Sequence, residues 1–206
     1  MRLDQVMSRP AVTVLPTDTI KGAAQIMAAG GFTLLPVVGP DGALAGVVNE
    51  GDLVDHRFPR DAREFGDPRE PEQPAPPARS SVADVMVTEV LYATPDEDVP
   101  ALIDRMRRAR VRAVPVCDGN QVIGVVTYRD LVRILARSDE LIAADVRRRL
   151  GLYTATGRFE VRVSAGEVEL IDVMDRPAEW YTVRRLAEQV LGVLRARVVR
   201  PISQSQ

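Results

Sequence analysis

Apolar positions along the chain alternate between short continuous runs and stretches with a helical period. Short β-branched runs at 11–14 and 90–93 precede Pro16 and Pro95, and each run predicts a strand. After each proline, apolar residues recur every three or four positions, which predicts an amphipathic helix. The expected buried faces are Ile20, Ala23, Ala24 and Met27 in one helix, and Val99, Leu102, Ile103 and Met106 in the other.

Two further apolar runs follow each of these helices and flank a turn. Gly and Asp form the predicted turns, at 39–42 and at 118–120, so each pair of runs is expected to be a hairpin. A second helix is expected to begin near Asp52 and near Asp130. The pattern therefore predicts an α+β fold with two β-α-β-β-α units.

The two units are copies of one another. At an offset of 79 residues, Val6-Met7 matches Val85-Met86 and Pro36-Val37 matches Pro115-Val116. After a one-residue deletion in the second copy, Gly46-Val47-Val48 matches Gly124-Val125-Val126 and Asp52-Leu53-Val54 matches Asp130-Leu131-Val132. We assign the first copy to residues 1–57 and the second to 81–137. Residues 58–80 are rich in proline and charge, which favours a stiff, partly extended linker; a regulatory segment is the alternative.

A different pattern begins after the second copy and extends over 139–200. A short helix around Leu141–Leu150 is followed by an alternating hairpin, a helix through Trp180 and a last strand before 200. This predicts a separate small α-β-β-α-β domain, with 201–206 as a terminal tail.

Composition and charge exclude several function classes. The chain has 206 residues, 46% of them hydrophobic, and a formal net charge of -2, so it can bury a core and has no basic excess that would favour nucleic acid. One cysteine and one histidine, Cys117 and His56, exclude a disulfide framework and a Cys/His zinc site within one chain. No catalytic constellation is present, so no enzyme and no cofactor are expected. The N-terminal residues carry an acid and no apolar run, which predicts a cytoplasmic protein without a secretory signal.

The duplicated unit resembles a tandem of CBS domains, the regulatory module named after cystathionine beta-synthase. The resemblance rests on Val6-Met7 and Val85-Met86, on the strands at Pro36 and Pro115, and on the two segments 46–52 and 124–130. It implies a module with pseudo-two-fold symmetry and two clefts that often hold adenosine-containing ligands. It also implies a homodimer formed through the helices of the repeats.

The resemblance assigns one cleft to a nucleotide. Asp130 would accept the two ribose hydroxyls, Thr127 would offer its hydroxyl to a phosphate or to ribose, and Arg112 would contact phosphate. The adenine slot would be built by Val12, Phe32, Thr33, Leu34 and Val125.

The second cleft departs from this pattern, because Asn49 replaces the hydroxyl residue and Thr33 stands where Arg112 stands in its twin. Asp52 keeps the ribose position, so this cleft is expected to bind weakly or not at all.

Each of these residues also has a purely structural interpretation. Asp130 and Asp52 are suited to helix caps, Thr127 to the end of a strand, and Arg112 to a solvated arginine-rich helix end. Cys117 is expected to be a small buried hydrophobe, and His56 to be exposed and without a role.

The last 65 or so residues resemble a BON domain, a small module linked in bacterial envelope proteins to phospholipid surfaces. The matching residues are Asp145-Val146, the hairpin strands at 161–163 and 166–170, and 186–193, whereas Asp172 stands where a small residue is common. We therefore predict a non-enzymatic sensor that binds an adenosine-containing ligand and relays this to its BON domain. The alternative is a scaffold with empty clefts, whose BON domain binds a lipid surface, an ion or a protein.

Overall fold

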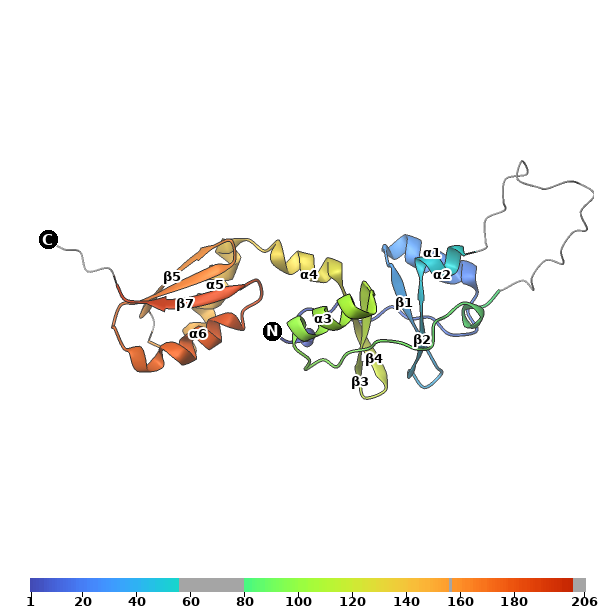
Figure 1. The fold of residues 1–206 in the computed structure, drawn as a ribbon, viewed down its shortest axis with the longest axis horizontal. Helices are drawn as coiled ribbons and strands as arrows, with labels where there is room; N and C mark the ends of the chain where they lie inside the picture. Colours follow the sequence, from blue (N-terminus) through green and yellow to red (C-terminus); the bar gives the residue numbers. More distant parts are fainter. Residues whose placement is uncertain (56–79, 156, 202–206) are drawn as a thin grey trace, which may run out of the picture. The chain divides into compact units, whose positions relative to one another are not determined.

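The computed structural model describes residues 1–55, 80–155 and 157–201, and its chain divides into two compact units (Figure 1). One unit consists of Met1–Val6, Asp98–Ala101 and Thr127–Gln206, and the other of Met7–Glu97 and Leu102–Val126. His56 and the predicted linker 58–80, apart from Ser80, lie outside the described residues.

The two repeats have the same order of elements. The first contains a 3-10 turn η1 (Leu3–Gln5), α1 (Ile20–Gly30), β1 (Leu34–Val38), β2 (Leu44–Asn49) and α2 (Glu50–Val54). The second contains η3 (Val82–Asp84), α3 (Val99–Ala109), β3 (Ala113–Asp118), β4 (Gln121–Thr127) and α4 (Tyr128–Leu135). The predicted helices and hairpins are therefore confirmed in both copies.

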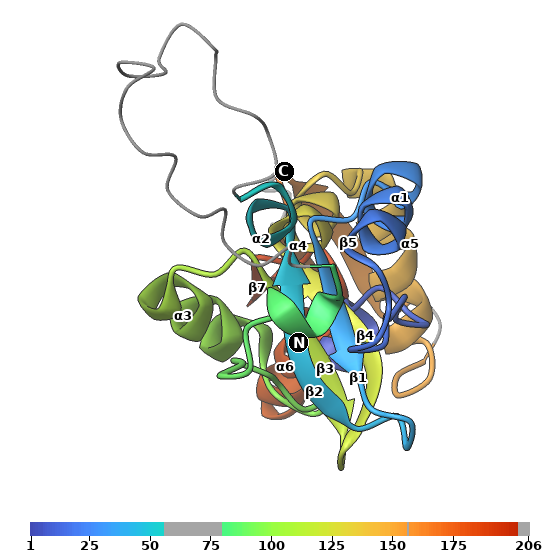
Figure 2. The ribbon, with the colours of Figure 1, turned by 90° about the vertical axis from the view of Figure 1, so that its right-hand side faces the viewer.

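Helices α1 and α2 pack on the hairpin β1–β2 and form one hydrophobic core with it (Figure 2). The strands are antiparallel, with Leu34 opposite Asn49 and Val37 opposite Gly46. Thr19 caps α1, since its side chain accepts a hydrogen bond from the Gly22 N–H at 3.0 Å. The predicted face of α1 is buried at Ile20, Ala23 and Met27, but Ala24 is exposed.

The prediction of a first strand in each repeat, at 11–14 and 90–93, is wrong. Each of these segments makes only a single parallel bridge, Val14 with Val37 and Ala93 with Val116. Val14 donates to the Pro36 carbonyl and accepts from the Val38 N–H, and Ala93 makes the same two bonds with Pro115 and Cys117.

Proline explains why neither bridge grows into a strand. The next rung on one side would need an N–H from Pro36 or Pro115, and the next rung on the other side an N–H from Pro16 or Pro95. None of the four prolines has this donor. The repeats are therefore α-β-β-α units with a one-residue bridge in place of the first strand.

The segment that leads into each repeat pairs with a strand of the other repeat. Val87 exchanges two backbone hydrogen bonds with Val47 of β2, at 2.8 and 2.9 Å, and Ser8 exchanges two with Val125 of β4, at 3.0 Å each. The residues beside these bridges are Gly46 and Gly124, which allow the crossing backbones to approach closely. The two copies are therefore interleaved.

The C-terminal region has the predicted α-β-β-α-β order. It contains α5 (Asp139–Leu150), β5 (Phe159–Ser164), β6 (Glu167–Asp172), a 3-10 turn η4 (Pro177–Glu179), α6 (Trp180–Glu188) and β7 (Arg195–Val199). The sheet order is β5-β6-β7, antiparallel in the first pair and parallel in the second. Helices α5 and α6 pack on each other and on the sheet, and Ile142, Val146, Leu170 and Ala187 lie in their common core.

A buried ion pair joins the two ends of the hairpin β5–β6 to helix α6. Arg158 and Asp172 are 4% and 0% exposed, and their two charged groups meet through hydrogen bonds of 3.2 Å. Asp172 also accepts from Trp180 Nε1 at 2.9 Å and from the Arg176 N–H at 2.9 Å, and Arg158 also contacts Glu179. Every charge in this cluster therefore has a partner, as burial demands.

This network controls the pKa of Asp172. Burial raises the pKa of the carboxyl group, but the hydrogen bonds from Arg158, from Trp180 and from two backbone N–H groups outweigh it and hold the pKa well below its usual range. The Asp172 carboxylate in turn raises the pKa of Arg158. The pair is therefore ionised at neutral pH.

Two features are absent from the described ranges 1–55, 80–155 and 157–201. No helix in them is long and apolar enough to cross a lipid bilayer. No group of three or more His, Cys, Asp or Glu side chains in them is placed to hold a metal ion.

Candidate functional site

Thr127 and Asp130 are brought together at the start of helix α4. Thr127 ends strand β4 and is the N-cap of α4, and its Oγ1 accepts from the Asp130 N–H at 3.2 Å. Asp130 Oδ2 in return accepts from the Thr127 N–H at 2.9 Å and from the Thr127 hydroxyl at 2.6 Å. This reciprocal arrangement is a capping box, so both residues cap α4, and a further role in ligand binding stays a prediction.

The Asp130 carboxylate also contacts Arg133 through its second oxygen. Its side chain is only 5% exposed, and its second oxygen, Oδ1, faces the exposed Arg133 guanidinium at 3.4 Å. This contact is longer than the two that Oδ2 makes with Thr127. Because the Arg133 side chain is 71% exposed, solvent screens this ion pair.

Asn49 and Asp52 lie in the equivalent positions at the start of α2. Asp52 Oδ2 accepts from the Asn49 N–H at 2.7 Å and from Asn49 Nδ2 at 3.2 Å. Thr33 lies next to this pair, because its carbonyl accepts from the Glu50 N–H at 3.4 Å. The two repeats thus place an aspartate and its capping partner in equivalent positions, with an amide in one and a hydroxyl in the other.

The remaining predicted site residues are distributed over several environments. Leu34 and Val125 share a small core with Val47 and Ala113, so these two are brought together. Phe32 packs instead on the core beneath α1, and Val12 and Arg112 are exposed. Thr127 and Asp130 belong to one compact unit, whereas Arg112, Val125 and the first-repeat residues belong to the other. A single cleft built from all eight residues therefore stays a prediction.

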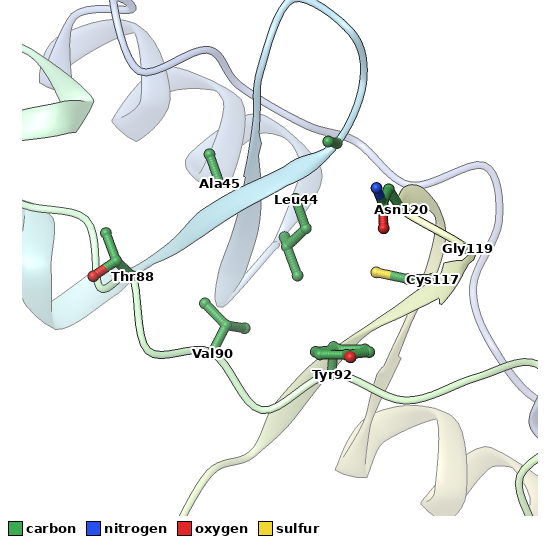
Figure 3. Close-up of a pocket in the computed structure, with 9 residues that line it drawn as sticks. Leu44, Ala45, Thr88, Val90, Tyr92, Cys117, Gly119 and Asn120 are labelled. Atoms are coloured by element: carbon green, nitrogen blue, oxygen red, sulfur yellow. The ribbon is translucent and has the colours of Figure 1, made fainter.

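A cavity that the sequence did not point to lies between the two hairpin turns of the repeats (Figure 3). Its volume is about 360 Å³. Figure 3 shows Leu44, Val90 and Tyr92 around it, with the sulfur of Cys117 pointing inward and the Asn120 amide above. Thr88, Ala43, Ala45 and Gly119 complete the lining.

The described residues that line the cavity carry no charged side chain. Cys117 is 3% exposed, and burial raises the pKa of its thiol, so the group is neutral at neutral pH. This confirms the expectation that Cys117 is a small buried residue. The other polar side chains in the lining are a hydroxyl of Thr88, a phenol of Tyr92 and an amide of Asn120.

Sequence comparison identifies the two repeats. The pattern that defines the CBS domain matches residues 3–58 and 82–137. The chain is 27% identical over 169 residues to inosine-5'-monophosphate dehydrogenase of Methanocaldococcus jannaschii, a match that covers 82% of this chain and 30% of that protein. It is 29% identical over 131 residues to homoserine O-acetyltransferase of Methanococcoides burtonii, covering 63% of this chain and 23% of the enzyme. The chain thus spans less than a third of the length of these enzymes.

A smaller relative is matched over most of its length. The CBS domain-containing protein YhcV of Bacillus subtilis is 27% identical over 125 residues, covering 61% of this chain and 79% of YhcV.

Solved structures share the fold of the repeats. A signal-transduction protein with CBS domains from Burkholderia ambifaria matches with a TM-score of 0.52 and 25% identity, over 66% of this chain and 94% of that one. The CBS domain pair of protein MJ0100, in complex with 5'-methylthioadenosine and S-adenosyl-L-methionine, matches with a TM-score of 0.53 and 23% identity, over 65% of this chain and 94% of that one. CBSX2 in complex with AMP matches with a TM-score of 0.50 and 19% identity, over 64% of this chain and 93% of that one.

Proposed function

The chain belongs to the CBS domain family, and from this premise we propose that it is a non-enzymatic regulatory sensor of an adenosine-containing ligand. The observation that carries the proposal is the buried Asp130 carboxylate, which α4 holds in a capping box with Thr127. The MJ0100 and CBSX2 structures contain adenosine compounds bound to the same fold. As part of the same proposal, the protein acts in the cytoplasm. Residues 139–200, called the C-terminal unit below, form a BON domain that relays the signal.

The hydrogen bonds refine the role of each proposed site residue. Asp130 would accept ribose hydroxyls at Oδ1 in place of Arg133. Thr127 already donates its only hydroxyl proton to Asp130, so toward a ligand it can accept from ribose but cannot donate to a phosphate oxygen. The phosphate contact would therefore fall to Arg112, whose exposed guanidinium suits this geometry. Val12, Phe32, Thr33, Leu34 and Val125 are proposed to surround the adenine.

The cleft of Asp52 and Asn49 is proposed as the weaker site. Asn49 supplies an amide where the twin has a hydroxyl, and Thr33 supplies no positive charge for a phosphate. A ligand without phosphate would be tolerated best there.

The sensor predicts a ligand-dependent rise in melting temperature that depends on Asp130. The protein is melted alone and with AMP, ADP, ATP, S-adenosylmethionine or NAD. At a hundredfold excess over the dissociation constant, a ligand bound only by the native state adds about 2.7 kcal/mol, which raises the melting temperature by about 5–10 °C. We expect Asp130→Ala to abolish this shift.

Because Asp130→Ala also removes a helix cap, only the ligand-induced shift is compared, and Asp130→Asn serves as a variant of the same shape. Asp52→Ala removes the equivalent cap and is the matched control, for which most of the shift is expected to remain. The sensor proposal is rejected if no compound raises the melting temperature of the protein. It is also rejected if the rise is the same in Asp130→Ala as in the natural sequence.

We also propose that the protein is a homodimer formed through the helices of its repeats. Val54 of α2 and Val132 and Leu135 of α4 are exposed, and Leu135 is 64% accessible. Such apolar residues on helix surfaces favour burial against a second copy. A monomeric mass in light scattering would contradict this.

A second candidate function is binding of the C-terminal unit to a phospholipid surface, with the repeats as a scaffold. The observation in its favour is a set of exposed apolar residues at one end of its sheet, in the loops and in the first turn of α6, where Phe159 pairs with Asp172. The set consists of Leu152, Tyr153, Val173, Met174 and Tyr181. Arg184 stacks on Tyr181, which adds positive charge at this end.

This candidate predicts that the full chain sediments with anionic vesicles of phosphatidylglycerol at physiological salt. Tyr153→Ser should reduce sedimentation. Leu194→Ser is the control, because Leu194 is equally exposed but bonds to Gly166 at the opposite end of the sheet. Equal binding of both variants, or no sedimentation at all, would reject the lipid interpretation.

A further inference from the structure

We propose that the cavity between the two hairpin turns is a second ligand site, which takes a small, uncharged, planar aromatic molecule. The cavity volume of about 360 Å³ is at the lower end of the range of small-molecule pockets, so it fits a substituted ring rather than a nucleotide. It shares no residue with the sites proposed for the adenosine ligand.

The lining selects for this class of molecule. Leu44 and Val90 offer apolar contact, and the half-exposed Tyr92 ring offers an aromatic face on which a planar ligand can stack. The Asn120 amide and the Thr88 hydroxyl can each donate and accept, so they suit a neutral polar substituent such as a carboxamide. A charged ligand would gain no opposite charge from this lining.

The walls of the cavity are already fixed by hydrogen bonds. The two hairpin turns are joined by the Leu44 N–H, which donates to the Asn120 carbonyl at 3.2 Å, and by Gln121 Nε2, which donates to the Asp41 carbonyl at 2.7 Å. The segment of Tyr92 is also anchored, because the Arg105 guanidinium donates to the Tyr92 carbonyl at 2.8 Å. The same guanidinium donates to both carboxylate oxygens of Glu97. A ligand would therefore order little of the protein, which favours binding.

The two repeats differ at the positions that line this cavity. At the offset of 79, the residues at equivalent positions in the other copy are Arg9 for Thr88 and Thr13 for Tyr92. The other copy thus has a charged residue, Arg9, and no aromatic ring at these positions, whereas this side is neutral and aromatic. This difference between the two copies indicates that a neutral, aromatic lining is found on only one side of the module.

Benzamide and benzoate test the proposal, because they have nearly the same shape and differ in charge. The two compounds are titrated into the full-length protein while the backbone amide signals of Leu44, Gly119 and Asn120 are followed by NMR. We expect saturable shifts with benzamide and none with benzoate. Tyr92→Thr, which installs the residue of the twin, should weaken benzamide binding about tenfold, and Tyr92→Phe should retain it.

The same titration in Asp130→Ala separates this proposal from the nucleotide sensor, since benzamide binding is expected to be unchanged there. The proposal is overturned if benzamide gives no saturable shift, if benzoate binds equally well, or if Tyr92→Thr has no effect. Tyr92 is 51% exposed, so the variant should fold, and the dispersion of the NMR spectrum verifies this directly.

Discussion

Replacing Asp172 with asparagine is expected to destabilise the C-terminal unit by about 3–5 kcal/mol, because it leaves the Arg158 guanidinium buried without its counter-charge. The substitution keeps the shape of the side chain but removes its charge. Trp180, the only tryptophan of the chain, donates to Asp172, so its fluorescence reports this unit specifically. Urea unfolding followed by Trp180 fluorescence measures the effect.

The same carboxylate predicts how stability depends on pH. The pKa of Asp172 is lowered in the folded state, so its stabilising contribution is complete well above the unfolded pKa of about 3.9 and is lost as the pH falls below that value. The natural sequence should therefore lose stability more steeply than Asp172→Asn between about pH 4 and pH 2, by about 1.4 kcal/mol per pH unit at most.

An exposed ion pair provides the control for this prediction. Glu160 and Arg162 are both more than half exposed, so Glu160→Gln is expected to change stability by no more than about 1 kcal/mol. If Asp172→Asn lowers the free energy of unfolding no more than Glu160→Gln does, the buried pair is not a main source of stability in this unit.

Most of the fold could be predicted because its signals are local or repeated. The two repeats can be aligned from the sequence alone. The hairpins and amphipathic helices follow from patterns a few residues long. The first strands failed because the prediction considered only the apolar runs at 11–14 and 90–93. Whether such a run forms a ladder depends on its partner, and Pro36 and Pro115 lack the required N–H.

The candidate sites were predictable to a smaller extent. Asp130 and Asp52 were found because the repeats align there and the resemblance to CBS domains assigns both to a ribose position. The cavity beside Tyr92 joins residues from three separate segments, and the buried Arg158 contacts residues 14 and 21 positions away. Asp172 was noted only as a departure from a family pattern. A comparison of the two repeats position by position was the one signal that could have pointed to the cavity.

The interleaving of the repeats gives the second large effect, at Gly124. A Cβ atom there would lie 2.9 Å from the Ser8 carbonyl oxygen and 2.7 Å from the Met7 sulfur. The methionine can move, but the carbonyl accepts the Val125 N–H at 3.0 Å and is fixed by that bridge. Ala in a strand normally stabilises relative to Gly, yet we expect Gly124→Ala to destabilise by about 1–3 kcal/mol.

Gly46→Ala tests the symmetry of this arrangement, since its Cβ would lie 2.8 Å from the Val87 carbonyl in the other crossing. Both variants should unfold at lower urea concentration than the natural sequence in circular dichroism. Gly51→Ala is the matched control, because Gly51 lies within α2 with no atom within 4 Å of the added Cβ, so a gain of up to about 1 kcal/mol is expected. Unchanged or increased stability in Gly46→Ala and Gly124→Ala would mean that the crossings between the repeats are looser than the hydrogen bonds at Val87 and Ser8 imply, and that each repeat holds its hairpin without the other.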